Sequence, residues 1–157
     1  MTDTPALRAI AASGIPHRVV RTERATSAEE SARFQRIPLG ALLRTLVVRR
    51  GEGDYLFVLV PGGRKFDWPK LRELLGVRRM TMPDAGEARE VTGYERGAIT
   101  PFGARSVLPV IIDGAAMEHE TVAIGGGAHG VNLHLSPRDL ADHFGATIAD
   151  ISLPEGA

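Results

Sequence analysis

The order of hydrophobic and polar residues along the chain predicts several short helices separated by strand-like runs. Ser27 with Glu30 three residues later is a capping-box pattern, and Asp84 with Glu87 repeats it. A glycine after the last apolar residue marks a helix end, because glycine adopts the left-handed C-cap conformation without strain. We therefore expect helices over 5–13, from Ser27 to about Arg36, from the Asp67 cap to Gly76, from the Asp84 cap to Gly93, and from Ser136 onward.

Runs rich in β-branched and aromatic residues predict the strands. The clearest pair is 45–50 and 55–61, which a Gly-containing turn joins as a β-hairpin. Pro109 lies inside the run 106–113 and indicates an edge strand or a bulge, because proline donates no hydrogen bond. Further strands are expected at 17–20, Val77–Met82, 121–124, 131–135 and 146–151. This irregular alternation predicts an α/β fold with a mixed sheet flanked by helices.

A segment with little periodicity, residues 94–106, follows the fourth predicted helix. It contains Gly97, Pro101 and Gly103, which are typical of turns. We expect an ordered loop, and loops of this length within a compact domain tend to carry function.

The composition indicates one domain spanning residues 1–157. A hydrophobic content of 43% is enough to bury a core. The absence of Cys excludes disulfides, thiolate nucleophiles and Cys-containing zinc sites. No basic stretch followed by an apolar run opens the chain, and no apolar window approaches the ~18 residues of a membrane span. We expect a cytoplasmic protein with no membrane partner.

Charge is balanced overall but not along the chain. The formal net charge is zero, yet residues 1–79 carry 15 Lys and Arg against 8 Asp and Glu, whereas residues 80–157 carry 4 against 11. The overall balance argues against a protein that coats nucleic acid, so DNA is not an expected partner. A local basic face for phosphates is one interpretation, and solvated ends of strands and helices are the other. The residues concerned are Arg49, Arg50, Arg64, Lys65, Arg78 and Arg79.

Three glycines, Gly125, Gly127 and Gly130, match the G-x-G-x-x-G dinucleotide-binding pattern directly after a strand. That pattern requires a helix that begins at its last glycine, whereas here the alternating run 131–135 follows. A turn between two strands, whose backbone N–H groups face a ligand or adopt positive φ, is the better interpretation. We expect no cofactor.

Other catalytic constellations are missing. The histidines do not have metal-ligand spacing, so we expect no metal and no loss of activity after chelation. No G-x-S-x-G elbow is present, which argues against a serine nucleophile.

Six segments carry a family resemblance, in this order: LRTLVVR (43–49), YLFVLVPGGRKFDWPKL (55–71), VTGYERGAITPFG (91–103), LPVIID (108–113), VAIGGGAHGVNLHLSPRDL (122–140) and GATIADI (145–151). Together they resemble the YbaK and prolyl-tRNA-synthetase-associated (ProX-type) family of editing domains over residues 5–151. The most specific parts are the G-x-x-x-P formed by Gly97 and Pro101, and the GGG-x-x-G turn followed by a strand and S-P-x-D-L. The resemblance implies one YbaK-type domain with a largely antiparallel, strongly curved sheet.

The resemblance also implies an activity: hydrolysis of the ester that joins a wrong amino acid to the terminal ribose of tRNA. Water would attack a carbonyl that backbone N–H groups stabilise, with no cofactor or metal. The implied catalytic residues are Arg44, Gly97 and Pro101. The implied substrate-binding residues are Thr45, Thr100, Gly125, Gly126, Gly127 and Asn132. The implied partners are the aminoacylated 3′ end of a tRNA, with tRNA-Pro as one candidate, and an aminoacyl-tRNA synthetase. We expect the turn 125–130 to join two paired strands beside the loop that carries Gly97 and Pro101.

The sequence departs from the family at three positions. Arg44 stands where the family has Lys, so the positive charge is kept but its shape changes. Gly125 and Asn132 stand where the branch that acts on cysteinyl-tRNA has Ser and Asp, so its substrate is not transferred. Because of Arg44, a catalytically silent module that binds the tRNA end or a synthetase is the alternative, and a small-molecule-binding regulator is a third.

Overall fold

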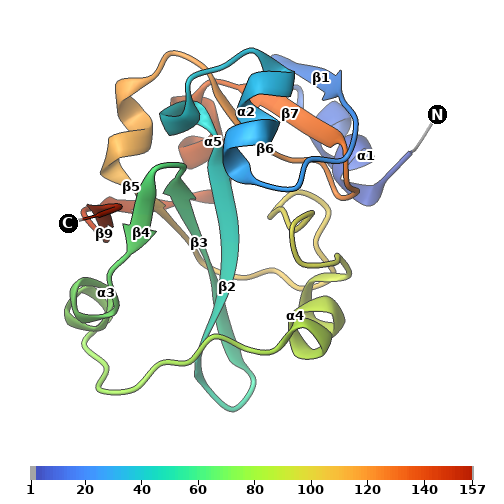
Figure 1. The fold of residues 1–157 in the computed structure, drawn as a ribbon. Helices are drawn as coiled ribbons and strands as arrows, with labels where there is room; N and C mark the ends of the chain where they lie inside the picture. Colours follow the sequence, from blue (N-terminus) through green and yellow to red (C-terminus); the bar gives the residue numbers. More distant parts are fainter. Residues whose placement is uncertain (1–2, 157) are drawn as a thin grey trace.

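In the computed structural model, which describes residues 3–156, the strands are divided among three sheets (Figure 1). The largest has the order β2-β3-β5-β8, the second β1-β7-β6 and the smallest β4-β9. Among the strand pairs of residues 3–156, β5 pairs in parallel with β3 and with β8, and the other pairs are antiparallel; an isolated parallel bridge also joins Leu42 to Ala123 of β6. The strands are β1 (His17–Arg21), β2 (Leu43–Gly51), β3 (Asp54–Pro61), β4 (Arg64–Phe66), β5 (Val110–Asp113), β6 (Val122–Gly125), β7 (Val131–Leu135), β8 (Thr147–Ala149) and β9 (Ser152–Pro154). The prediction of a mixed, largely antiparallel arrangement is confirmed, although not as a single sheet.

Local capping signals position the helices. They are α1 (Pro5–Ser13), α2 (Ala28–Gln35), α3 (Trp68–Leu75), α4 (Ala85–Thr92) and α5 (Pro137–Phe144). Each begins after a Thr, Ser or Asp whose side-chain oxygen accepts a hydrogen bond from a backbone N–H in the first turn. All five predicted helix starts are confirmed. Helix α2 ends at Arg36 in the left-handed conformation, with φ 59°. None of the helices in the described residues is long and apolar enough to cross a membrane.

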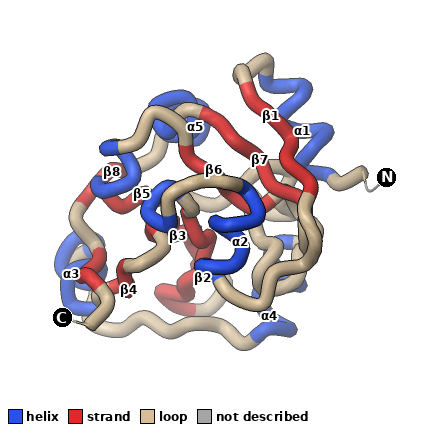
Figure 2. Tube along the Cα trace, turned by 45° about the horizontal axis from the view of Figure 1, so that its top comes forward, coloured by secondary structure: helices blue, strands red, loops and turns tan. Residues whose placement is uncertain are grey.

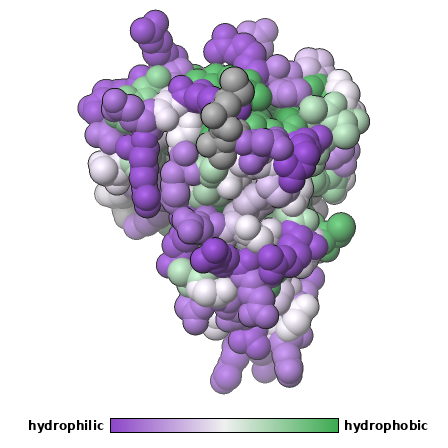
Figure 3. All heavy atoms as spheres, turned by 90° about the vertical axis from the view of Figure 1, so that its right-hand side faces the viewer, coloured by the Kyte–Doolittle hydropathy of each residue, from purple (hydrophilic) through white to green (hydrophobic). Residues whose placement is uncertain are grey.

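The hydrophobic core lies on both faces of the four-stranded sheet. Alternate residues of β3 face opposite ways: Phe57 and Leu59 join the cluster under α1, α5 and the three-stranded sheet, whereas Leu56 and Val58 join the cluster under α3. This double burial explains why the run 55–61 is almost continuously apolar. Figure 2 shows β3 and β5 inside the molecule, and Figure 3 shows a mainly hydrophilic surface on the side of α4.

The structure corrects several predicted strands. Residues Val77–Met82 form no strand, and a single bridge joins Thr81 to Arg49. The strand predicted at 106–113 begins only at Val110, after Pro109, and β5 lies inside its sheet rather than at an edge. Proline is tolerated because it precedes the strand and acts only as an acceptor, from Phe57 N at 2.9 Å.

The end of the chain also differs from the prediction. The run 146–151 forms only the short edge strand β8, and the chain then continues into β9. Neither β9 nor its partner β4 was predicted, because strands of three residues have no periodicity to detect.

Candidate functional site

A cavity of about 390 Å³ lies where the first strand of the hairpin meets the glycine turn. This volume is within the range of small-molecule sites. Its lining comes from four parts of the chain: residues 22–28 and Ser31 before and within α2, residues 42–46 of β2, the loop residues Arg96, Gly97 and Ile99, and the turn residues Gly125 and 128–132. Figures 1 and 2 show α2 beside the start of β2. The cavity therefore lies between the three-stranded sheet and the edge of the four-stranded sheet.

Arg44 and Thr45 lie side by side on the cavity wall formed by β2. As neighbours in a strand they direct their side chains to opposite faces of the sheet, but β2 is an edge strand, so both residues can border a cavity at that edge. Arg44 Nη2 donates to the carbonyl oxygen of Arg64. Within residues 3–156, Arg44 Nε and Thr45 Oγ1 are the buried side-chain polar atoms that have no hydrogen-bond partner in the protein. An unpaired buried polar group is costly, so two of them at one cavity indicate a place where a ligand completes the hydrogen bonding.

The two glycine segments are in direct contact, as expected. Strands β6 and β7 pair antiparallel, with Gly125 opposite Asn132, so the turn does join two paired strands. A Cβ atom built on Gly125 would lie 3.1 Å from the carbonyl oxygen of Ile99. A Cβ atom on Gly97, where φ is 93°, would lie 3.2 Å from the ring of His129. The loop carrying Gly97 and the turn therefore form one continuous wall of the cavity.

Hydrogen bonds within the loop 94–106 and from the loop to α4 make it ordered, as predicted. The hydroxyl of Tyr94 donates to the carbonyl of Phe102 at 2.7 Å, and Ser106 Oγ donates to the carbonyl of Val91 at 2.8 Å. Burial raises the pKa of Tyr94 to about 12, so this hydroxyl stays protonated and continues to donate.

Four of the predicted site residues lie behind this wall rather than on it. Thr100 and Pro101 are buried and do not line the cavity. Gly126 donates its N–H to Val131 O and accepts from Thr4 Oγ1, and Gly127 packs against Tyr94. These four residues shape the loops through contacts with the start of α1 and the core. Arg44, Thr45, Gly97, Gly125 and Asn132 do line the cavity.

Some backbone N–H groups of the loop that carries Gly97 are not available to a ligand. Ala98 N donates to Glu95 O, and proline has no N–H. In the part of the chain that the structure describes, the N–H groups of Gly97 and Ile99 donate to no acceptor. Because both residues line the cavity, their N–H groups are candidate donors to a ligand.

The structure adds charged residues that the sequence did not single out. His129 lines the cavity, and its Nε2 lies 3.4 Å from the carboxylate of Glu95. Arg24 and Arg96 join Arg44 on the lining, against one carboxylate, that of Glu23. The lining therefore has an excess of positive charge, which favours an anionic ligand. The position of His129 inside the glycine turn was the signal available in the sequence.

No metal site accompanies these residues in the part of the chain that is described. No three His, Asp or Glu side chains of residues 3–156 are grouped closely enough to hold an ion. The two serines on the lining are engaged in hydrogen bonds: Ser27 Oγ accepts from Glu30 N, and Ser31 Oγ accepts from Gln35 Nε2.

Comparison with known proteins gives the class. Residues 22–143 match the family described as "Aminoacyl-tRNA editing domain", and the chain belongs to that family. This matches the resemblance that the sequence segments carry.

Individual relatives agree with this family. An Enterococcus faecalis protein named "Putative Cys-tRNA(Pro)/Cys-tRNA(Cys) deacylase EbsC" is 24% identical over 97% of this chain and 94% of its own length. A proline–tRNA ligase of Trichlorobacter lovleyi is 30% identical over 79% of this chain but only 21% of the ligase. Among solved structures, a "putative trans-editing enzyme for prolyl tRNA synthetase" is 27% identical, with a TM-score of 0.88 over 99% of this chain and 100% of that chain.

Proposed function

We propose that the protein is a trans-editing deacylase, which hydrolyses the ester between a wrong amino acid and the terminal ribose of a tRNA. The observation that carries the proposal is the pair of unpartnered polar groups, Arg44 Nε and Thr45 Oγ1, in a positively charged cavity of a chain from the editing family. An aminoacyl ester on a phosphate-rich RNA end supplies acceptors for these donors and negative charge for the arginines.

The chemistry uses water as the nucleophile. Water adds to the ester carbonyl, the bond between that carbon and the ribose oxygen breaks, and the ribose oxygen takes up a proton. The N–H groups of Gly97 and Ile99, together with the Arg44 side chain, are the donors available to the oxyanion as charge develops. His129 is the imidazole on the lining and is positioned to accept the proton of the attacking water. The products are the free amino acid and an uncharged tRNA.

The names of the relatives support the choice of substrate. Names of similar proteins refer to Cys-tRNA(Pro) and to prolyl-tRNA synthetase, so mischarged tRNA-Pro is the first substrate to test. This chain spans about a fifth of the proline–tRNA ligase that it matches, so a synthetase acting as a separate partner would contribute tRNA selection. Cysteine is not assigned as the amino acid, because Gly125 and Asn132 differ from the cysteinyl branch.

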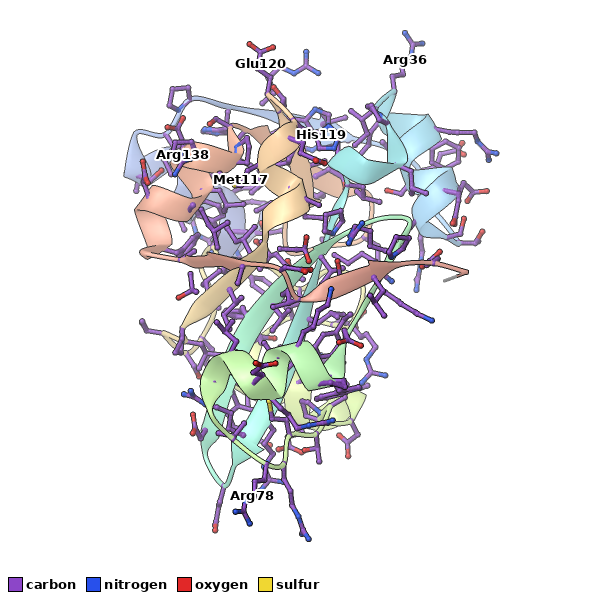
Figure 4. All side chains as sticks on the ribbon, turned by 90° about the vertical axis from the view of Figure 1, so that its left-hand side faces the viewer. Arg36, Arg78, Met117, His119, Glu120 and Arg138 are labelled. Atoms are coloured by element: carbon purple, nitrogen blue, oxygen red, sulfur yellow. The ribbon has the colours of Figure 1, made fainter. Side chains whose placement is uncertain are left out.

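The test is a deacylation panel with purified protein, in which tRNA-Pro charged with alanine, cysteine, serine or proline is followed by loss of the labelled amino acid. At least one mischarged tRNA should be hydrolysed faster than Pro-tRNA. Arg44→Ala should lower the rate about 10²- to 10³-fold, because it removes a charge-assisted donor, whereas Arg44→Lys keeps the charge and should retain activity. Arg138→Ala, an exposed arginine on α5 outside the cavity lining, is the matched control and should leave the rate unchanged (Figure 4).

One result would overturn the proposed function, and another would overturn the role of Arg44 in it. Hydrolysis of none of the panel, together with weaker binding of the tRNA end to Arg44→Ala, would identify a silent binding module. Equal rates for wild type and Arg44→Ala would remove Arg44 from the site without affecting the family assignment.

A further inference from the structure

The side chain of Arg44 connects the cavity lining to the two-stranded sheet of β4 and β9. Arg44 lines the cavity, and its Nη2 donates to the backbone carbonyl of Arg64, the first residue of β4. Within residues 3–156 this carbonyl is the one hydrogen-bond acceptor of the Arg44 guanidinium. The orientation of the Arg44 guanidinium therefore depends on where β4 holds that carbonyl.

Strand alternation directs the carbonyl toward Arg44. The carbonyl oxygen of Gly63 accepts from Glu155 N, and Asp67 N donates to the carbonyl oxygen of Ile151. Residues 63, 65 and 67 consequently turn their backbone groups toward β9, as in any antiparallel ladder. The backbone groups of Arg64, which lies between them, face the opposite way. Pairing with β9 is thus what leaves the Arg64 carbonyl available.

The side chain of Arg64, unlike its backbone, does bind β9. Its Nε donates to Ser152 Oγ at 2.6 Å, and its Nη2 contacts the carbonyl oxygen of Ser152 at 3.3 Å. Ser152 is fully buried and lies beyond residues 22–143, which match the family. Hydrogen bonds from a guanidinium are charge-assisted and stronger than neutral ones, so this contact restrains the backbone of Arg64.

We infer that Arg64 and Ser152 are positioning residues, which fix the β4 carbonyl and thereby orient the Arg44 guanidinium for deacylation. The kinetic part of this inference rests on the proposed function. The partner of Arg44 is a neutral carbonyl and not a carboxylate, so the side chain is oriented while its charge remains available to the substrate. Preorganised charge of this kind lowers a barrier more than mobile charge does.

The kinetic experiment is a double-mutant cycle on the best substrate of the panel. Ser152→Ala should lower kcat about tenfold and change KM less than about twofold, within the ~10²-fold that a misplacement of about 1 Å can cost. In the Arg44→Lys background, where Nη2 is absent, Ser152→Ala should change kcat less than about twofold. Ser13→Ala is the matched control: it removes a serine hydroxyl that bonds to Ile10 and Ile15 in and after α1, outside the cavity lining, and should not change kcat.

Two kinetic outcomes contradict the inference. Equal losses of kcat in both backgrounds would mean that Ser152 acts through general stability. No loss in the wild-type background would mean that the contact with Arg64 does not orient Arg44.

A spectroscopic readout separates this inference from the proposed function. In ¹H–¹⁵N spectra, the guanidinium signal of Arg44, assigned by its loss in Arg44→Lys, should be sharp in the wild type and broadened in Ser152→Ala. If the wild type hydrolyses none of the panel, the proposed function fails and these spectra decide the inference alone. Broadening confined to Ser152→Ala would support the positioning role, and identical spectra would overturn it.

Discussion

Replacing Thr45 with valine should make the protein more stable and less active at the same time. The hydroxyl of Thr45 is buried and has no partner in the protein, and valine has nearly the same shape without the hydroxyl. An unsatisfied buried hydroxyl costs ~1–3 kcal/mol, so its removal should raise the free energy of unfolding by about 1 kcal/mol. For a chain of this size, 1 kcal/mol corresponds to a rise in Tm of roughly 2–4 °C.

The effect on the reaction should have the opposite sign. If the substrate is what completes the hydrogen bonding of Thr45, the valine variant loses one neutral hydrogen bond, worth ~0.5–1.5 kcal/mol. This corresponds to a fall in kcat/KM of about 2- to 10-fold, since 1.36 kcal/mol is tenfold. Thermal unfolding of the free protein and single-turnover deacylation measure the two effects separately.

Thr92→Val is the matched control for the stability measurement. Thr92 is equally a threonine in the interior, but its hydroxyl donates to Ala88 O at 2.8 Å and accepts from Tyr94 N at 3.1 Å. Its loss leaves the N–H of Tyr94 unpaired and should cost about 1–3 kcal/mol. If Thr45→Val lowers Tm as Thr92→Val does, or leaves kcat/KM unchanged, the hydroxyl of Thr45 does not await a ligand.

Three further changes test the fold around the site. Gly130→Ala places a Cβ 2.5 Å from the carbonyl oxygen of Thr22 at φ 78°, so combined strain and overpacking should cost about 2–5 kcal/mol in denaturant unfolding; a loss under 1 kcal/mol would contradict this. Arg36 is the C-cap of α2, it adopts a left-handed conformation that strains any residue with a Cβ atom, and its side chain extends into solvent (Figure 4). Arg36→Gly should remove this strain and raise the free energy of unfolding by about 0.5–1 kcal/mol, and a lower Tm would refute the assigned strain. Burial, and after it the charge of Arg18, lowers the pKa of His134 below 6.5 in the folded protein. The unfolded state therefore binds a proton more readily than the folded state, so the free energy of unfolding is fully present above pH ~6.5 and declines as pH falls. Tm measured between pH 7.5 and 5.5 should fall less in His134→Gln than in wild type, and equal slopes would exclude this histidine as the cause.

The parts of the fold that were predictable are those specified by neighbouring residues. Ser27 and Asp84 mark helix starts within one turn of sequence, and the hairpin of β2 and β3 follows from a short turn between two apolar runs. By contrast, β4 and β9 are three residues each and exist because they pair across the molecule. No local pattern encodes such a pairing, and the strand predicted at 77–82 failed for the converse reason, since only Thr81 finds a partner.

The candidate site divides in the same way. The contact between the loop at Gly97 and the turn at Gly125 was predictable from the family resemblance. The direction in which each loop residue faces was not, because the start of α1 occupies the far side of Gly126 and Gly127. The place of His129 on the cavity lining was not predictable for a related reason. Its closeness to Gly97 depends on how the turn folds back, which the spacing of residues along the chain does not reveal.

The dispersed origin of the cavity lining has a consequence for folding. The wall residues come from 22–31, 42–46, 96–99 and 125–132, and the central sheet pairs β3 with β5 across some fifty intervening residues. Contacts between distant segments form late, because closing long loops costs entropy before any contact repays it. The β2–β3 hairpin can form early, but it contributes only one wall. A nascent or partly folded chain therefore has no cavity, and deacylation, where measured, reports on completion of the entire fold.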